Sequence, residues 1–189
     1  MKRLTILIAA YLLFFAISAF ADGGGGMMFG YQATDYPFLE NYGIRDNDLG
    51  LIYYGGYGYG IDRRGNITGG FGVAIMDPGM EETGISGGFG GVINGYRLIK
   101  RPLTIDALLF TGFGGISTGT YETESGGSGF FGLFLELDLE VGIPVTSWFM
   151  PVIYAGYQVI GNLIPGDFFS HFISYAPVIG GRVSWGKMY

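Results

Sequence analysis

The chain has 189 residues, of which 16 are acidic and 10 basic, a formal net charge of −6 and no Cys. The acidic balance argues against nucleic acid as a partner, because phosphates demand a basic face. Without Cys there are neither disulfides nor thiolate metal sites. Hydrophobic residues make up 49% of the chain, yet no apolar run after Ala21 reaches the roughly 20 residues of a membrane-spanning helix.

Residues 1–21 have the features of a secretory signal peptide. Lys2 and Arg3 form a positive start, an apolar core follows, and Ala19-Phe20-Ala21 is a small-x-small cleavage site. The alternative, a membrane anchor helix, is disfavoured because the apolar core is short for a span. Cleavage after Ala21 leaves eight basic and 16 acidic residues, so we expect a mature net charge of −8.

The mature chain begins with a glycine run over residues 22–26, which we interpret as a flexible lead-in to one β-domain at 27–189. The first strand candidate, residues 27–33, is short and alternates weakly. Without it the domain has seven strands, and closure of a barrel is in question. Residues 34–50 are polar and rich in turn-forming residues, which indicates a loop.

Two alternating segments follow at 51–61 and 66–76, joined by the turn sequence Asp62-Arg63-Arg64-Gly65. In each segment, large apolar side chains occupy every second position, and small residues occupy the positions between them. If the apolar side chains face outward, the glycines face the interior, where they let a narrow barrel bend. The expected outward residues are Leu51, Tyr53, Tyr57, Tyr59, Ile61, Ile67, Phe71, Val73 and Ile75, and the inward ones include Gly56, Gly58, Gly60, Gly70 and Gly72.

The next two strands are predicted at 85–98 and 103–116, separated by a turn at 99–102. Gly87-Gly88-Phe89-Gly90 repeats Gly69-Gly70-Phe71-Gly72 at a spacing of 18 residues, which suits one strand and its connection. Arg97 falls on the parity that we expect to face outward, at a strand end from which it would reach lipid headgroups.

The strand predicted at 130–143 shows the clearest alternation in the chain. Its odd positions are all apolar, whereas Glu136, Asp138 and Glu140 lie on the other parity. Since side chains of a strand point alternately to its two faces, one face is continuously apolar and the other carries three carboxylates. An apolar solvent on one side and an enclosed polar space on the other would produce this pattern.

The remaining strands are predicted at 149–161 and 174–189, which brings the total to eight. The connections alternate between long ones, at 34–50, 77–84, 117–129 and 162–173, and short ones, at 62–65, 99–102 and 144–148. Outer-membrane barrels have short periplasmic turns and longer outer loops, and their strands exceed the usual 5–6 residues of soluble proteins. The pattern predicts an all-β, eight-stranded antiparallel up-and-down transmembrane barrel.

In these features the chain resembles the small eight-stranded outer-membrane barrels as a class. Members of that class end on an aromatic residue preceded by apolar residues at alternate positions; Tyr189, Trp185 and Val183 fit this, and Lys187 departs from it. The resemblance implies the outer membrane of a Gram-negative-type envelope, the bilayer as partner, and a structural role or contact with an extracellular partner through the outer loops. The alternatives are a soluble exported barrel that binds a small apolar ligand, and a glycine-rich fibre subunit.

With the apolar parity outward, a polar network is expected in the lumen. Its members are Asp106, Glu136, Asp138, Glu140, Arg182 and Ser184, with Arg182 as the only strongly basic residue inside. We expect Asp106 to lie near Asp138, so that the pair shares a proton or binds a cation unless it is a structural filling. No cofactor, metal site or nucleotide-binding motif is predicted.

Two further patterns concern the ends of the strands. Gly115-Ile116-Ser117-Thr118-Gly119 fits G-x-S-x-G, with Asp167 and His171 following in hydrolase order, but no helical period follows Ser117 as that motif requires. We therefore expect no enzyme, with Ser117, Asp167 and His171 as the only catalytic candidates.

Near the predicted periplasmic ends lie the candidates for membrane-interface aromatics, which are Trp148, Phe149, Trp185 and Tyr189.

Overall fold

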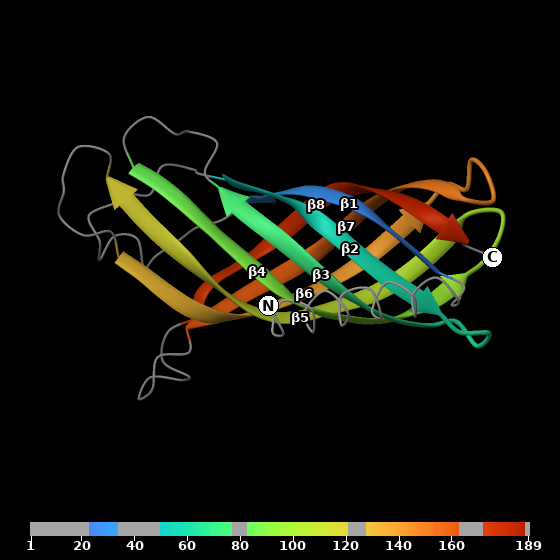
Figure 1. Cartoon of the computed structure of the whole chain (residues 1–189), viewed down its shortest axis with the longest axis horizontal. Coiled ribbons are helices and arrows are strands. Elements are labelled where there is room, and N and C mark those ends of the chain that lie inside the picture. The colour runs from blue at the N-terminus through green and yellow to red at the C-terminus, as the bar shows by residue number, and fades with distance from the viewer. Residues whose placement is uncertain (1–22, 34–49, 77–82, 121–127, 163–171, 188–189) are drawn as a thin grey trace, which may run out of the picture.

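The computed structural model describes residues 23–33, 50–76, 83–120, 128–162 and 172–187, and these form one closed antiparallel barrel (Figure 1). Eight strands follow one another around it in chain order, which confirms the predicted fold class. Their bounds are β1 Gly23–Ala33, β2 Gly50–Ile61, β3 Asn66–Met76, β4 Thr83–Ile99, β5 Thr104–Thr120, β6 Ser128–Gly142, β7 Phe149–Asn162 and β8 Phe172–Lys187.

The first strand closes the barrel. β1 pairs with β2 along its whole length and with β8 on its other edge, from Gly23 opposite Lys187 to Gln32 opposite Val178. The expected weak strand therefore exists and is longer than expected, because four glycines of the run interpreted as a lead-in are its first residues. Hydrogen bonds from both neighbouring strands hold these glycines extended despite their low strand propensity.

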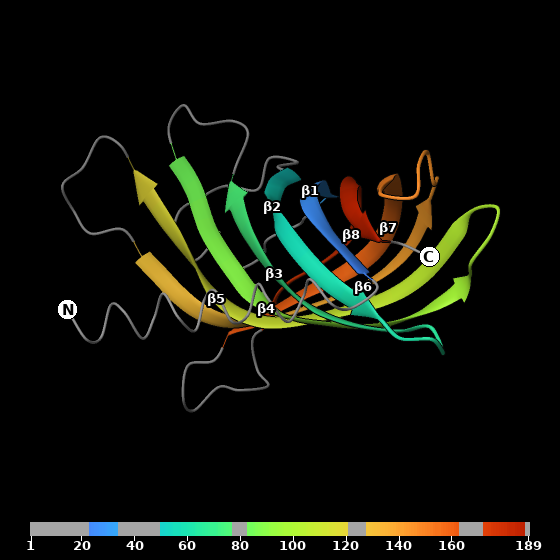
Figure 2. The ribbon, with the colours of Figure 1, turned by 45° about the vertical axis from the view of Figure 1, so that its right-hand side comes forward.

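The two ends of the barrel differ in their connections. At the end that we call the short-turn end, β2–β3, β4–β5 and β6–β7 are joined by residues 62–65, 100–103 and 143–148, and β1 begins beside the end of β8. These connections lie together in Figure 1, and Figure 2 shows the same end from a second side. We call the opposite end the long-loop end. The predicted alternation of connection lengths holds only in part, because 77–82 and 143–148 each have six residues. β5 also runs on to Thr120, where a loop from 117 was expected.

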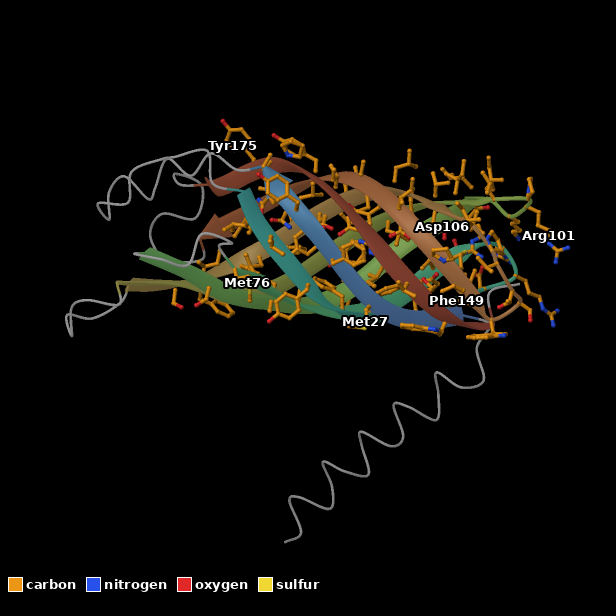
Figure 3. The ribbon with its side chains drawn as sticks, turned by 90° about the horizontal axis from the view of Figure 1, so that it is seen from above. Met27, Met76, Arg101, Asp106, Phe149 and Tyr175 are labelled. Carbon is orange, nitrogen blue, oxygen red and sulfur yellow. The ribbon has the colours of Figure 1, made fainter. Side chains whose placement is uncertain are left out.

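The faces of β6 are as predicted. Leu137 is 60% exposed on the outside of the barrel, whereas the neighbouring Glu136 is 1% exposed inside. Large apolar side chains also cover the outside of β1, β5, β7 and β8, including Met27, Phe29, Phe113, Ile153 and Ile179. Figure 3 shows side chains standing out around the wall, Met27 among them. The barrel thus has an apolar outer surface and carboxylates in its interior.

The expected facing of β2 and β3 was wrong. Tyr53 and Ile75 are 1% exposed and point inward with the other large residues of their parities, while glycines such as Gly58 and Gly72 face outward. The physical reason lies in the narrow lumen, which has to be filled by side chains at this strand number. Glycines pointing inward would have left a void, and voids are costly in a close-packed interior.

The interior is divided along the barrel axis. Toward the long-loop end it is apolar, with Leu51, Ile75, Ile116 and Ile160 buried. In the middle, ring pairs Phe71–Phe110, Phe71–Phe134 and Phe89–Phe134 have centroids 5.2–5.4 Å apart. The buried charged side chains lie between this aromatic cluster and the short-turn end, whereas the buried Gln32 lies opposite Leu51 toward the long-loop end. No helix among the described residues is long and apolar enough to cross a membrane.

Candidate functional site in the barrel interior

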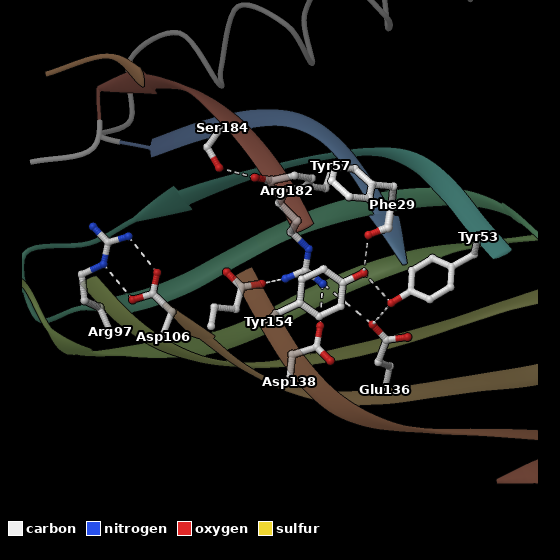
Figure 4. Close-up of polar contacts among 11 residues, drawn as sticks. Phe29, Tyr53, Tyr57, Arg97, Asp106, Glu136, Asp138, Tyr154, Arg182 and Ser184 are labelled. Carbon is white, nitrogen blue, oxygen red and sulfur yellow. Dashed lines mark hydrogen bonds and ion pairs between the residues drawn. The ribbon is translucent and has the colours of Figure 1, made fainter. Parts of the chain in front are cut away.

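Arg182 of β8 is the centre of the interior polar network (Figure 4). Its guanidinium forms ion pairs with three carboxylates of β6: Nη2 lies 2.5 Å from Asp138 Oδ2 and 3.8 Å from Glu136 Oε1, and Nη1 pairs with Glu140. The three carboxylates share one face of β6 because their spacing is two residues. One planar cation with five donors can address all three.

Aromatic rings surround the same guanidinium. Its Cζ lies 4.0 Å from the ring centroid of Tyr154, 4.6 Å from that of Phe110 and 5.6 Å from that of Tyr57. A cation over aromatic faces gains attraction from the ring quadrupole, more so where water is excluded. Arg182 is therefore fixed both by its ion pairs and by stacking.

A second ion pair lies nearer the short-turn end. Arg97 of β4 donates from Nε and Nη2 to the two carboxylate oxygens of Asp106 on β5, each at 2.8 Å, in a bidentate arrangement. The two residues are direct cross-strand partners, and both are buried. The expected outward position of Arg97 was therefore wrong, as was the expectation of Arg182 as the only strong base inside.

The expected proximity of Asp106 and Asp138 was also wrong. Asp106 lies opposite Glu140 in the β5–β6 ladder, and Asp138 lies opposite Leu108. The two carboxylates therefore sit two residues apart along the barrel wall and have different arginine partners. The strand order was sufficient to bring β5 and β6 together, but the register depends on a connection whose conformation the sequence does not specify.

A chain of hydrogen bonds runs from Glu136 to the backbone of β1. The Tyr53 hydroxyl lies 3.3 Å from Glu136 Oε1 and 2.5 Å from the Tyr154 hydroxyl, which donates to the Phe29 carbonyl at 3.1 Å. Two hydroxyl protons cannot serve three contacts. All three form together only when a third proton is present, and Glu136 is the member of this chain that can carry it.

Three inward glycines make room for these side chains. A Cβ on Gly30 would lie 2.5 Å from the Tyr154 hydroxyl oxygen and 2.6 Å from Cε1 of Tyr53. A Cβ on Gly180 would meet Tyr154, and one on Gly156 would meet Asp138, whose carboxylate leans over the strand partner that has no side chain. Glycine at these positions is thus required by close approach of large neighbours.

The remaining polar groups complete the network. Gln158 donates from Nε2 to Glu136 Oε2 at 2.7 Å, and Ser184 forms a hydrogen bond with the hydroxyl of Tyr57. Asp138 Oδ1 and Gln158 Oε1 have no hydrogen-bond partner among the described residues. In that part of the chain the interior holds two arginines and four acidic side chains. No group of three potential metal-binding side chains occurs in the described ranges.

The hydrolase-like candidates do not form a described site. Ser117 lies within β5, is exposed, and donates from Oγ to the Ser86 carbonyl of β4 at 3.2 Å. The strand continues to Thr120, so the turn into a helix that a nucleophile elbow requires does not follow Ser117. Asp167 and His171 lie outside the described residues, as do the signal peptide at 1–21 and Tyr189.

Three of the four predicted interface aromatics meet at the short-turn end. The rings of Trp148 and Phe149 have centroids 5.9 Å apart, and those of Phe149 and Trp185 are 6.4 Å apart. Trp148 and Trp185 are exposed on the outside of the barrel. Phe149 is paired with Trp185 across the β7–β8 ladder, which explains why residues 36 positions apart in sequence form one cluster.

The sequence patterns did not predict that Arg97 and several tyrosines face the barrel interior. Tyr53, Tyr57 and Tyr154 all contact the network, yet the first two were placed outside with the apolar residues of β2. One signal was available on β4, where Arg97 shares its parity with Phe89 and Ile93. A charged residue in the same row as large apolar ones indicates that the row faces the interior.

No protein-family model and no curated protein matches this chain. Among solved structures, the chain is similar to the crystal structure of Ail, the attachment invasion locus protein of Yersinia pestis. The likeness has a TM-score of 0.43 and 14% sequence identity, and covers 87% of this chain and 99% of Ail. At that score the likeness says nothing about the role of this chain. The assignment of the fold rests on the strand pairing, which closes the sheet into a barrel.

Proposed function

We propose that the protein spans the outer membrane of a Gram-negative-type envelope as a plugged β-barrel with a structural or surface-interaction role. The main support for this proposal is that β6 has apolar side chains on its outer face and acidic side chains on its inner face, the reverse of a water-soluble barrel. On β6, Leu137 and Leu139 are exposed outside, and Glu136, Asp138 and Glu140 are buried inside. A barrel in water would place its leucines inside, because apolar burial drives folding there.

The strand lengths support a membrane-spanning barrel. The eight strands have 11 to 17 residues, and a tilted strand needs about 9–11 residues to cross the hydrocarbon core. Closure of β1 onto β8 leaves no unpaired sheet edge, as lipid demands, because backbone groups find no water there. The cluster of Trp148, Phe149 and Trp185 at one end suits the membrane–water boundary.

The interior supports a barrel without an open pore. The aromatic cluster with Phe71, Phe110 and Phe134 fills the middle of the lumen, and Arg182 with its carboxylates fills the section next to it. Barrels of eight strands have room inside for side chains and little else. The role proposed is accordingly non-enzymatic, with any outside partner contacting the segments that join the strands at the long-loop end.

Membrane insertion can be tested by reconstitution. The expected result is a protein that stays with phospholipid vesicles after washing with high salt and with alkali, and that migrates on a denaturing gel at a different position when heated. Recovery of folded protein in the aqueous phase without detergent would overturn the membrane proposal and favour the soluble barrel.

Conductance measurements in a planar bilayer test whether the lumen is closed. A filled lumen predicts no unitary conductance steps, whereas steady large steps would show an open pore.

A further inference from the structure

Basic side chains gather at one end of a chain that is otherwise acidic. Four exposed basic residues lie in two turns at the short-turn end: Arg63 and Arg64 between β2 and β3, and Lys100 and Arg101 between β4 and β5. We call these four residues the basic turn surface. Arg101 stands at this end of the barrel in Figure 3. The one carboxylate in the same two turns, Asp62, is engaged by the backbone of its own turn.

The Asp62 carboxylate accepts four hydrogen bonds within its own turn. Asp62 Oδ1 accepts hydrogen bonds from the backbone N–H groups of Arg64, Gly65 and Asn66 at 2.8–2.9 Å, and Oδ2 accepts from the Asn66 side chain at 2.6 Å. The carboxylate shapes the turn, in which Gly65 takes a φ of 101° that favours glycine. No ion pair links Asp62 to Arg63 or Arg64 among the described residues. The two turns together carry four positive charges and one negative charge.

The two turns are joined to one another. The backbone N–H of Arg97 donates to the Gly65 carbonyl at 2.8 Å, and Lys100 Nζ donates to the Arg63 carbonyl at 3.4 Å. The ring of Tyr96 lies beside Gly65, because a Cβ at Gly65 would be 3.6 Å from its Cε2. The four basic residues therefore sit on one connected platform and not on two independent loops.

The position of this platform indicates its partner. Lys100 and Arg101 directly follow the outward-exposed Leu98 and Ile99, and Leu103 is exposed two residues further on. The basic side chains thus begin where the apolar outer surface ends. In a membrane-spanning barrel that is the depth of the lipid phosphates, which long basic side chains reach while their stems stay on apolar surface.

The strand order divides the rim at this end into two unlike halves. β3 and β4 lie across the barrel from β7 and β8. The half at β7 and β8 carries Trp148, Phe149 and Trp185, and its turn at 143–148 has no charged residue. One basic residue, Lys187, ends β8 on this half, against four in the two basic turns, so the basic half is the better suited to anionic headgroups.

We infer that the basic turn surface binds the phosphate groups of anionic phospholipids in the leaflet that faces the short turns. The inference rests on the proposed membrane-spanning function. A soluble polyanion or an acidic protein is the competing occupant. It is disfavoured because the basic residues lie beside exposed apolar side chains at the wall and not on a surface that projects away from it.

A tryptophan reporter tests this directly, since Trp148 and Trp185 are the only two Trp residues in the chain. A variant with Tyr96→Trp, Trp148→Phe and Trp185→Phe places one indole between the two basic turns. A matched variant with only Trp148→Phe keeps Trp185 on the opposite half of the rim. Each is reconstituted in vesicles, and quenching by brominated phosphatidylglycerol is compared with quenching by brominated phosphatidylcholine at low ionic strength.

The expected result is a preference for phosphatidylglycerol at position 96 of at least about fivefold, the size expected for one basic residue beside an anionic surface. High salt should reduce the preference, and Trp185, near a single basic residue, Lys187, should show a clearly smaller one. Replacing Arg63, Arg64, Lys100 and Arg101 with Gln should abolish it. If that variant does not insert, the two pairs are replaced separately, and each should lower the preference.

Equal quenching of the indole at position 96 by the two lipids would overturn the inference, as would an undiminished preference in the glutamine variants. A preference of the same size at Trp185 would also overturn it, since the basic half would then not be responsible. Failure of both lipids to quench either indole has a different meaning, because it would show that the barrel is not in the bilayer and would overturn the proposed function itself.

Discussion

Asp138 and Arg182 join two strands that are not neighbours. The carboxylate on β6 and the guanidinium on β8 are 2.5 Å apart, with β7 between the two strands in the sheet. The pair therefore spans the inner face of β7 and links two strands that share no backbone hydrogen bonds. Glu136 and Glu140 contact the same guanidinium, so a single cation stabilises three buried carboxylates.

Removing this cation is expected to be costly. Arg182→Met should lower the free energy of unfolding by about 3–5 kcal/mol, because it removes the cation that pairs with three buried acidic side chains. Urea unfolding of the reconstituted protein measures this. Arg64→Met is the matched control, since Arg64 is exposed in a turn and its loss should change stability by no more than about 0.5 kcal/mol. Equal effects of the two changes would contradict the central role of Arg182.

The carboxylates of the network should not be equivalent. Glu136→Gln keeps a donor for Tyr53 and an acceptor for the Gln158 amide, and Glu136 is 3.8 Å from the guanidinium, so we expect a loss of less than about 1 kcal/mol. Asp138→Asn removes a charge 2.5 Å from Arg182 and should cost about 3 kcal/mol.

Urea unfolding of the two variants side by side gives the comparison. A larger loss for Glu136→Gln than for Asp138→Asn would show that Glu136 is ionised and that its charge is needed.

The inward glycines provide a test of the facing of the strands. Gly30→Ala should cost about 1–3 kcal/mol, because its Cβ would meet Tyr53 and Tyr154 in the filled lumen. Gly58→Ala, on the outer face of β2, has no atom within 4 Å of the added Cβ and should be neutral or slightly stabilising. Thermal unfolding of both variants in the same detergent measures the difference. Destabilisation of Gly58→Ala to the same degree would mean that the outer face of β2 is covered.

The outer surface can be tested by introducing a charge. Leu137→Arg places a guanidinium on the outside of β6 and should cost about 2–4 kcal/mol if that face meets hydrocarbon. Val145→Arg lies in the turn at 143–148, where the same change should cost about 0–1 kcal/mol. Folding yields into vesicles and urea unfolding report both. A harmless Leu137→Arg would indicate an outer face in water.

The turn between β2 and β3 predicts a pH dependence at the end of the barrel. The hydrogen bond from the Asn66 side chain, with those from the backbone, lowers the pKa of Asp62 from its ordinary value of 3.8. Because the folded pKa is the lower one, the stabilisation is fully present above the ordinary pKa and is lost as the pH falls through the folded value. Asp62→Asn should flatten this part of the stability profile in acid. An unchanged profile would show that the hydrogen bonds do not favour the ionised carboxylate.

Alternation along single strands was readable from the sequence, because side chains of a strand face opposite sides whatever the fold. On β6 the two faces differ so strongly, leucines against Glu136, Asp138 and Glu140, that their directions followed as well. On β2 the directions of the two faces could not be predicted, since tyrosines alternate with glycines and either set could face the lipid or the interior. The tyrosines face inward because the lumen must be filled, and how it is filled depends on the other seven strands.

The sequence by itself determined seven strands, indicated a weak eighth, and determined the membership of Asp106, Glu136, Asp138, Glu140, Arg182 and Ser184 in the inward rows. Only the tertiary structure decided the partners: Arg97 for Asp106, Arg182 for three carboxylates, and Tyr53 with Tyr154 for Glu136. The physical reason is that a period of two is a local property of the backbone. Register and closure bring together residues as far apart as Tyr53 and Tyr154, and no local pattern specifies which of them will meet.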